Sequence, residues 1–158
     1  MTGIQTVAEF YIRLVYLAAI IAGLAGLGLY DMKKRRVPNR VLAVFLPIAL
    51  LAVVCAPQGE NLLQSTLLSL GGFAMGGGIL LVVALKAGGI GGGDIKLCAL
   101  LGLITGPFWI LFVLLIATLL AMAAGVIVRL TLRERPTDIA FVPFLAIGFM
   151  GFYLFNIF

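Results

Sequence analysis

Long apolar stretches recur along this chain, separated by short segments that carry nearly all of its charges. A helix of about 20 apolar residues crosses the hydrocarbon core of a bilayer, and a shorter one can cross where the membrane is thinned. The sequence is 63% hydrophobic and 11% charged, which is typical of helical membrane proteins. We therefore expect an all-α membrane protein, a single domain over residues 1–158, with six transmembrane helices at about 12–30, 41–56, 65–85, 95–105, 108–130 and 139–158.

The distribution of Lys and Arg predicts how these helices are oriented. Cytoplasmic loops of membrane proteins carry an excess of basic residues. Arg13 is the one basic residue on one side of the predicted topology. The loops after the first, third and fifth helices, together with the helix ends beside them, hold the other ten: Lys33, Lys34, Arg35, Arg36, Arg40, Lys86, Lys96, Arg129, Arg133 and Arg135. We expect those loops to be cytoplasmic and both termini to be non-cytoplasmic. The net charge of +5 follows from this bias, so we expect no nucleic-acid partner.

The chain has no histidine, which excludes several kinds of hydrolytic site. Ser-His and Cys-His nucleophilic schemes and the H-E-x-x-H zinc proteases all need that residue. Its two cysteines, Cys55 and Cys98, form no C-x-x-C pair, so we expect both to be buried apolar residues and neither to bind zinc. Carboxylate chemistry remains as the main hydrolytic option, and we expect no metal and no cofactor.

Two of the six acidic residues, Asp31 and Asp94, lie at the ends of predicted membrane helices. A carboxylate at the edge of the hydrocarbon region is costly to place and is a candidate functional group. The predicted topology brings both to the cytoplasmic face, where they could share one proton. For Asp31 alone the alternative is about equally good, because an acid could simply balance the neighbouring basic loop.

A glycine-rich segment, residues 88–93, directly precedes Asp94. Each glycine disfavours a helix by about 1 kcal/mol relative to alanine, so we expect non-helical backbone there. Without a Cβ, glycine would let an extended peptide approach the Asp94 carboxylate. The alternative is a flexible linker in which Asp94 caps the next helix. A phosphate-binding loop is excluded, because the G-x-x-x-x-G-K-[ST] spacing is missing.

The segments around the two aspartates resemble the motifs of the type IV prepilin peptidases, membrane aspartyl proteases of the GxGD class. The first matches D-x5-[IV]-P-N as Asp31, Val37, Pro38 and Asn39. The second matches G-x-G-D-x-K as Gly91, Gly93, Asp94 and Lys96. Residues 141–148 are similar to the family's Pro-containing segment at the start of the last helix, although Ala140 stands where many relatives have Pro. The resemblance covers roughly residues 30–148.

This resemblance implies a metal-independent aspartic endopeptidase that removes the leader of prepilins or pseudopilins at the cytoplasmic boundary of the cell (inner) membrane. Asp31 and Asp94 would be catalytic. We assign substrate binding to Gly91, Gly93, Lys96, Pro38 and Asn39. Lys96 could also tune Asp94 electrostatically, but we favour an ordinary lysine of a cytoplasmic loop. The chain resembles the compact members of the family that serve Tad/Flp-type pili or act on preflagellins, so we do not expect methyltransferase activity.

Two other classes of protein remain open. A small ion- or proton-coupled transporter would use Asp31 and Asp94 as ligands, and the glycine break resembles the discontinuous helices of transporters. Against it, no acid lies at mid-membrane and no internal repeat is evident. A structural subunit of pilus assembly would tolerate Asn at both positions.

Two further groups of residues predict packing and no site. Gly72 and Gly76, and likewise Gly102 and Gly106, have the spacing of small residues at helix contacts. The aromatic residues near the C-terminus predict lipid and interface contacts: Phe149, Phe152, Tyr153, Phe155 and Phe158.

Overall fold

The computed structural model describes residues 3–34, 39–55, 58, 60–87, 91–132 and 140–157. Within these residues the secondary structure is six α-helices and no strand, which confirms the all-α prediction. The helices are α1 (Gly3–Lys34), α2 (Asn39–Cys55), α3 (Leu62–Ala87), α4 (Gly92–Thr105), α5 (Pro107–Leu132) and α6 (Val142–Ile157).

Three of these helices are long and apolar enough to cross a membrane, through segments Leu14–Lys33, Leu62–Lys86 and Pro107–Thr131. The helices α2, α4 and α6 are shorter, at 17, 14 and 16 residues. At 1.5 Å per residue α4 is about 21 Å long, against about 39 Å for the 26 residues of α3. A short helix of this kind needs neighbouring helices around it to lie within a bilayer.

Several predicted boundaries differ from the observed ones; α1, for example, begins at Gly3, nine residues before the predicted start. The helix α4 begins at Gly92, so Gly92 and Gly93 are helical, although we expected non-helical backbone through residue 93. Packing of the rest of α4 outweighs the low helix propensity of two glycines in its first turn. The last helix begins at Val142, three residues later than expected, because Pro143 fits the first turn of a helix, where its missing N–H is no loss.

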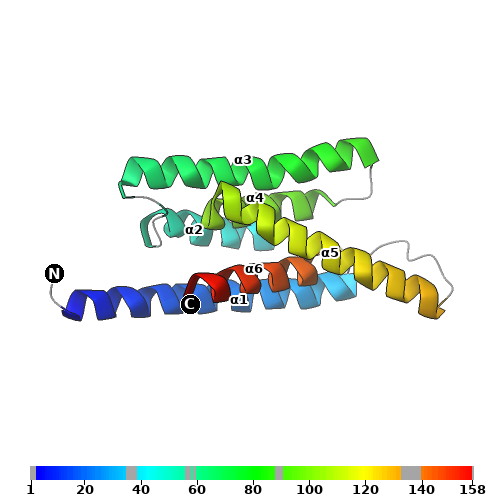
Figure 1. The fold of residues 1–158 in the computed structure, drawn as a ribbon, viewed down its shortest axis with the longest axis horizontal. Coiled ribbons are helices and arrows are strands. Elements are labelled where there is room, and N and C mark those ends of the chain that lie inside the picture. Colours follow the sequence, from blue (N-terminus) through cyan, green and yellow to red (C-terminus); the bar gives the residue numbers. More distant parts are fainter. Residues whose placement is uncertain are drawn as a thin grey trace.

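The helix α4 lies in the middle of the bundle and packs against α2, α3 and α5, while α1 packs against α6 and α2 (Figure 1). Its last nine residues, from Leu97 to Thr105, are all buried. The right-hand end of the bundle in Figure 1 contains the C-terminal ends of α1 and α3 and the N-terminal ends of α4 and α6. That end carries the candidate site.

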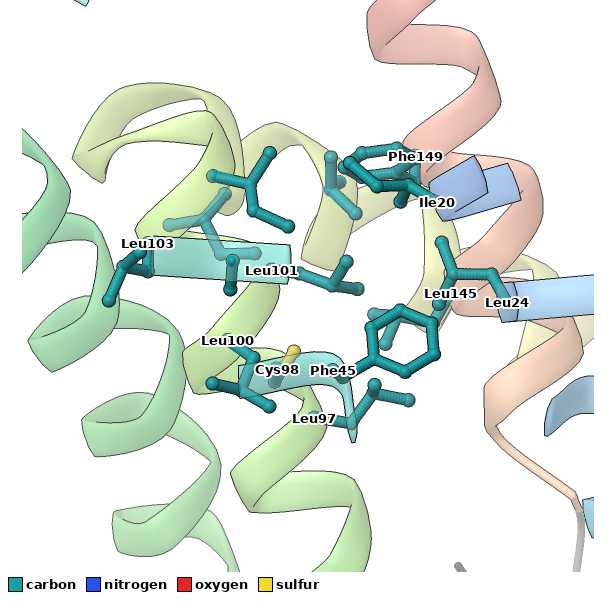
Figure 2. Packing of buried hydrophobic residues seen from close by; sticks show 14 of the residues in the cluster. Ile20, Leu24, Phe45, Leu97, Cys98, Leu100, Leu101, Leu103, Leu145 and Phe149 are labelled. Carbon is teal, nitrogen blue, oxygen red and sulfur yellow. The ribbon is translucent and has the colours of Figure 1, made fainter. Parts of the chain in front are cut away.

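The core is a cluster of apolar side chains from helices that are far apart in the sequence. Figure 2 shows members of this cluster from α1, α2, α4 and α6, among them Ile20, Leu24, Phe45, Leu97, Leu101, Leu145 and Phe149. Cys98 is a free, fully buried member, as predicted, and the side chain of Cys55 lies outside the described residues.

The prediction that the C-terminal aromatic residues face lipid was wrong for two of them. Phe149 is 0% exposed and Phe152 is 7% exposed. The ring of Phe152 lies 5.0 Å from that of Trp109 on α5, so α6 directs these rings inward against its neighbour. Tyr153 is half-buried, while the side chains of Phe155 and Phe158 lie outside the described residues.

The predicted packing role of the glycines is confirmed where α3 meets α4. A Cβ added at Gly72 would collide with the backbone carbonyl of Gly102, and one added at Gly102 would collide with that of Gly72. At Gly76 an added Cβ would come within 2.5 Å of the Cys98 carbonyl oxygen. The helices therefore touch backbone to backbone, which fixes α4, and with it Asp94, relative to α3.

Candidate active site

The two candidate catalytic residues lie at the same end of the bundle. Asp31 is in the last turn of α1 and Asp94 is the third residue of α4. Although α1 and α4 have little contact with each other, the two carboxyl groups are close enough to interact electrostatically. The structure thus brings together two residues that the sequence alone could place only on the same face of the membrane.

Asp31 is held among helices with almost no contact with solvent, at 4% exposure. Its Oδ2 accepts a buried hydrogen bond of 3.3 Å from the backbone N–H of Val142, the first residue of α6. One turn before Asp31, Gly28 lies against Pro143, with 3.6 Å between an added Cβ and the Pro143 Cα. Gly28 and Pro143 thus bring the start of α6 next to the carboxylate.

The alternative interpretation, in which Asp94 is the N-cap of α4, was wrong. The N-cap is Gly91, whose backbone is extended at φ −67° and ψ 137°. The carbonyl oxygen of Gly91 accepts hydrogen bonds from the N–H groups of Asp94, at 3.0 Å, and Ile95, at 3.3 Å. The Asp94 carboxyl turns back toward Gly91, where a Cβ would lie 3.2 Å from Oδ2. Asp94 is the third residue of the helix, a position from which an acid can reach back to the N-cap backbone.

Burial raises the pKa of Asp94 from its ordinary value of 3.8 to about 6, with repulsion from Asp31 as the second cause. A backbone hydrogen bond with Gly91 opposes this shift. Asp94 precedes the apolar stretch that begins at Ile95, so its carboxyl lies outside that span. When two neighbouring carboxyl groups cannot both ionise readily, the pair holds a single proton. This arrangement is suited to acid and base catalysis.

The second motif is joined to the first by a side-chain hydrogen bond. Lys96 Nζ donates to Asn39 Oδ1 over 3.1 Å, which connects the second turn of α4 with the first residue of α2. Lys96 and Asn39 are both exposed. Gly91 is exposed and Gly93 is half-buried, both beside Asp94 in the chain. Pro38, also assigned to substrate binding, lies outside the described residues. Substrate contact by these residues stays a prediction.

The model of the type IV leader peptidase family matches residues 18–127, more than half of the chain. The chain belongs to the type IV leader peptidase family. The prepilin leader peptidase/N-methyltransferase of Bacillus subtilis (strain 168) is 32% identical over 153 residues, covering 94% of this chain and 57% of that relative. The chain thus spans a little over half the length of this curated relative. No solved structure matches.

Membership of the leader peptidase family agrees with the resemblance drawn from the motifs. Asp31 and Asp94 both lie within the residues matched by the family model, whereas the start of α6 lies beyond them. Val142 is the member of the site that sequence reasoning missed. Its contribution is a backbone N–H, which any residue except proline supplies, so its side chain gives no signal. Pro143 gave an indirect one, since it marks where the helix starts.

Proposed function

We propose that the protein is an aspartic endopeptidase that removes the leader peptides of prepilins or pseudopilins without a metal ion. The observation that carries this proposal is the shared position of Asp31 and Asp94, at the end of α1 and the start of α4, in a member of the type IV leader peptidase family. There the two carboxyl groups are close enough to repel each other. The prepilin leader peptidase among its relatives supports the choice of substrate.

The chemistry proposed for the pair needs one proton and one water molecule. The ionised carboxylate acts as general base on the water, which attacks the scissile carbonyl carbon. The protonated carboxyl donates a hydrogen bond to the carbonyl oxygen and stabilises the negative charge that develops there. With a pKa of about 6, Asp94 keeps its proton under mildly acidic conditions and loses it as the pH approaches neutrality. A group that titrates near the working pH is suited to acid and base catalysis.

The proposed location is the cytoplasmic boundary of the cell membrane. At the end of the bundle where Asp31 and Asp94 lie, the helices also carry Lys33, Lys86, Lys96 and Arg129. Their shared position supports a topology of six spans in one domain, with this end in the cytoplasm and both termini on the other side. A bond at the start of a substrate's hydrophobic helix would lie at the depth of these carboxyl groups.

The decisive experiment measures leader cleavage by purified protein in proteoliposomes. The substrate is a synthetic prepilin with a basic leader followed by a hydrophobic helix, and mass spectrometry identifies the products. We expect Asp31→Asn and Asp94→Asn each to lower the rate at least about 1,000-fold, because a neutral amide cannot replace a member of the acid–base pair. Full cleavage by either folded variant would refute the aspartic mechanism.

Glu60→Gln provides the matched control, since it makes the same chemical change at an exposed acid between α2 and α3. We expect this variant to cleave at the wild-type rate. The same proteoliposomes test the transporter alternative. Proton or cation flux that depends on Asp31 and Asp94, in a preparation that yields no cleavage product, would replace the proposed function with transport.

A further inference from the structure

The start of α6 offers one backbone donor to Asp31, and the sequence explains why it is free. The N–H of Val142, at the first position of the helix, has no carbonyl oxygen one turn before it within α6. Pro143 has no N–H. The next donors, those of Phe144 and Leu145, both bond to the carbonyl oxygen of Phe141. Of the first four residues of α6, Val142 is therefore the one whose N–H reaches the Asp31 carboxylate.

We infer that Val142 is a positioning residue whose backbone N–H holds Asp31 as the ionised member of the pair, so that Asp31 is the general base and Asp94 the general acid. This inference rests on the proposed function, and it assigns the two roles that the sequence left open. An N–H bonds more strongly to a carboxylate than to a neutral carboxyl group. The positive end of the α6 dipole acts in the same direction on Asp31.

The other charged groups near the pair agree with this assignment. On α4, the titratable group that interacts with Asp31 is Asp94, while the Lys96 ammonium binds Asn39. Among the described residues at the start of α6, from Ala140 to Leu145, none is titratable. On α2, Asn39 is not titratable, and on α1 the exposed Lys33 lies two residues after Asp31. Asp94 also has a hydrogen bond with the Gly91 backbone, which lowers its pKa, but burial and repulsion from Asp31 raise the pKa by more.

The assignment gives a balanced reaction sequence. Asp31 takes a proton from water as the water oxygen bonds to the scissile carbonyl carbon, and the Asp94 proton moves to the carbonyl oxygen. The neutral tetrahedral intermediate then collapses. Asp31 gives its proton to the leaving nitrogen as the C–N bond breaks, and Asp94 recovers a proton from the hydroxyl as the carbonyl re-forms. Both residues finish in their starting states.

Val142→Pro tests the role of this N–H directly, because proline removes the donor at a helix position where its ring is tolerated. The measurement is kcat/KM for leader cleavage against pH. We expect the acidic limb to move to higher pH by about one unit, because a hydrogen bond that favours the ionised base is lost, while the alkaline limb stays in place. Val142→Ala keeps the N–H, so both limbs should stay where they are in the wild type, even if lost packing lowers the rate.

Two outcomes would overturn the inference. A shift of the alkaline limb in Val142→Pro would reverse the roles of Asp31 and Asp94. A lower rate with neither limb moved would leave Val142 as a structural residue only.

A second measurement does not depend on how Val142→Pro folds. Near pH 5 the wild type should show an infrared carbonyl band of a protonated carboxyl that is missing from the spectrum of Asp94→Asn and still present in that of Asp31→Asn. Loss of the band in Asp31→Asn would contradict the assignment. The band reports on proton location even if the wild type cleaves no leader, so failure of the proposed function would be distinguished from failure of the assignment.

Discussion

Lys96 Nζ lies 3.1 Å from Asn39 Oδ1, and this hydrogen bond joins residues 57 positions apart in the sequence. Each partner belongs to a different one of the two motifs; Asn39 is the first residue of α2 and Lys96 is the fifth residue of α4. The bond therefore holds the beginning of α2 against the beginning of α4, beside Asp94. This geometry favours a role for Lys96 in joining the two motifs over a role in setting the charge of Asp94.

We predict that Lys96→Met and Asn39→Ala weaken the same interaction. Because both side chains are exposed, the coupling energy between them should be small, about 0.5–1 kcal/mol in a double-mutant cycle of thermal unfolding. Cleavage should fall by no more than about tenfold in either single variant, and the double variant should be no worse than the poorer single one. Strictly additive losses in stability and rate would show that the two residues act independently.

Gly91→Ala should impair cleavage, because its Cβ would lie 3.2 Å from Asp94 Oδ2 and push the carboxyl group out of place. We expect kcat/KM to fall about 10- to 100-fold, with a loss of stability below about 1 kcal/mol. The neighbouring Gly92→Ala is the matched control, since no atom lies within 4 Å of its added Cβ. Equal activity of the two variants would mean that the approach of Gly91 to Asp94 has no functional consequence.

The pKa of Asp94 predicts how stability depends on pH. Folding raises this pKa from 3.8 to about 6, so the folded state binds the proton more tightly than the unfolded chain. The resulting stabilisation is complete below pH 3.8 and is lost as the pH rises through about 6. Asp94→Asn abolishes the dependence, so its melting temperature relative to the wild type should increase between pH 4 and pH 8.

Because the Asp94 carboxyl is partly exposed, solvent screens this effect, and we expect a difference of about 1 kcal/mol. Glu60→Gln, the same chemical change at an exposed acid, is the control for general effects of removing a carboxylate. If Asp94→Asn and the wild type had parallel curves, the carboxyl group would have to titrate alike in the folded and unfolded chains.

The fold class and the shared location of the two aspartates could be predicted from sequence, because hydropathy and the positions of charges carry that information. The inward packing of Phe149 and Phe152 could not, since an aromatic residue near the end of an apolar helix suits lipid and a protein core equally well. The start of α4 was misjudged for a related reason. The low helix propensity of glycine can be read from the sequence, whereas the burial of residues 97–105, which stabilises the helix, cannot.

At the candidate site, side chains could be predicted and backbone contacts could not. Asp31 and Asp94 were identified because a carboxylate is rare and costly in an apolar chain. The donor to Asp31 is an amide N–H 111 positions away, which became visible only when α6 was placed against α1. The Lys96–Asn39 bond likewise needed the relative positions of α2 and α4, although both residues had been selected from their motifs.

The backbone contact between α3 and α4 provides the sharpest test of the packing that positions Asp94. An added methyl at Gly72 or Gly102 would collide with the carbonyl of the facing helix, so the two helices would have to separate. We expect Gly72→Ala and Gly102→Ala each to cost about 3 kcal/mol of unfolding free energy and to lower cleavage, because α4 carries Asp94 with it.

Gly78→Ala, also on α3, meets no atom within 4 Å and should match the wild type or stabilise it by up to about 1 kcal/mol. Thermal unfolding in detergent compares the three variants directly. If Gly72→Ala had the same melting temperature as Gly78→Ala, the two helices could not be in backbone contact. The position of Asp94 would then have to be set by other parts of the bundle.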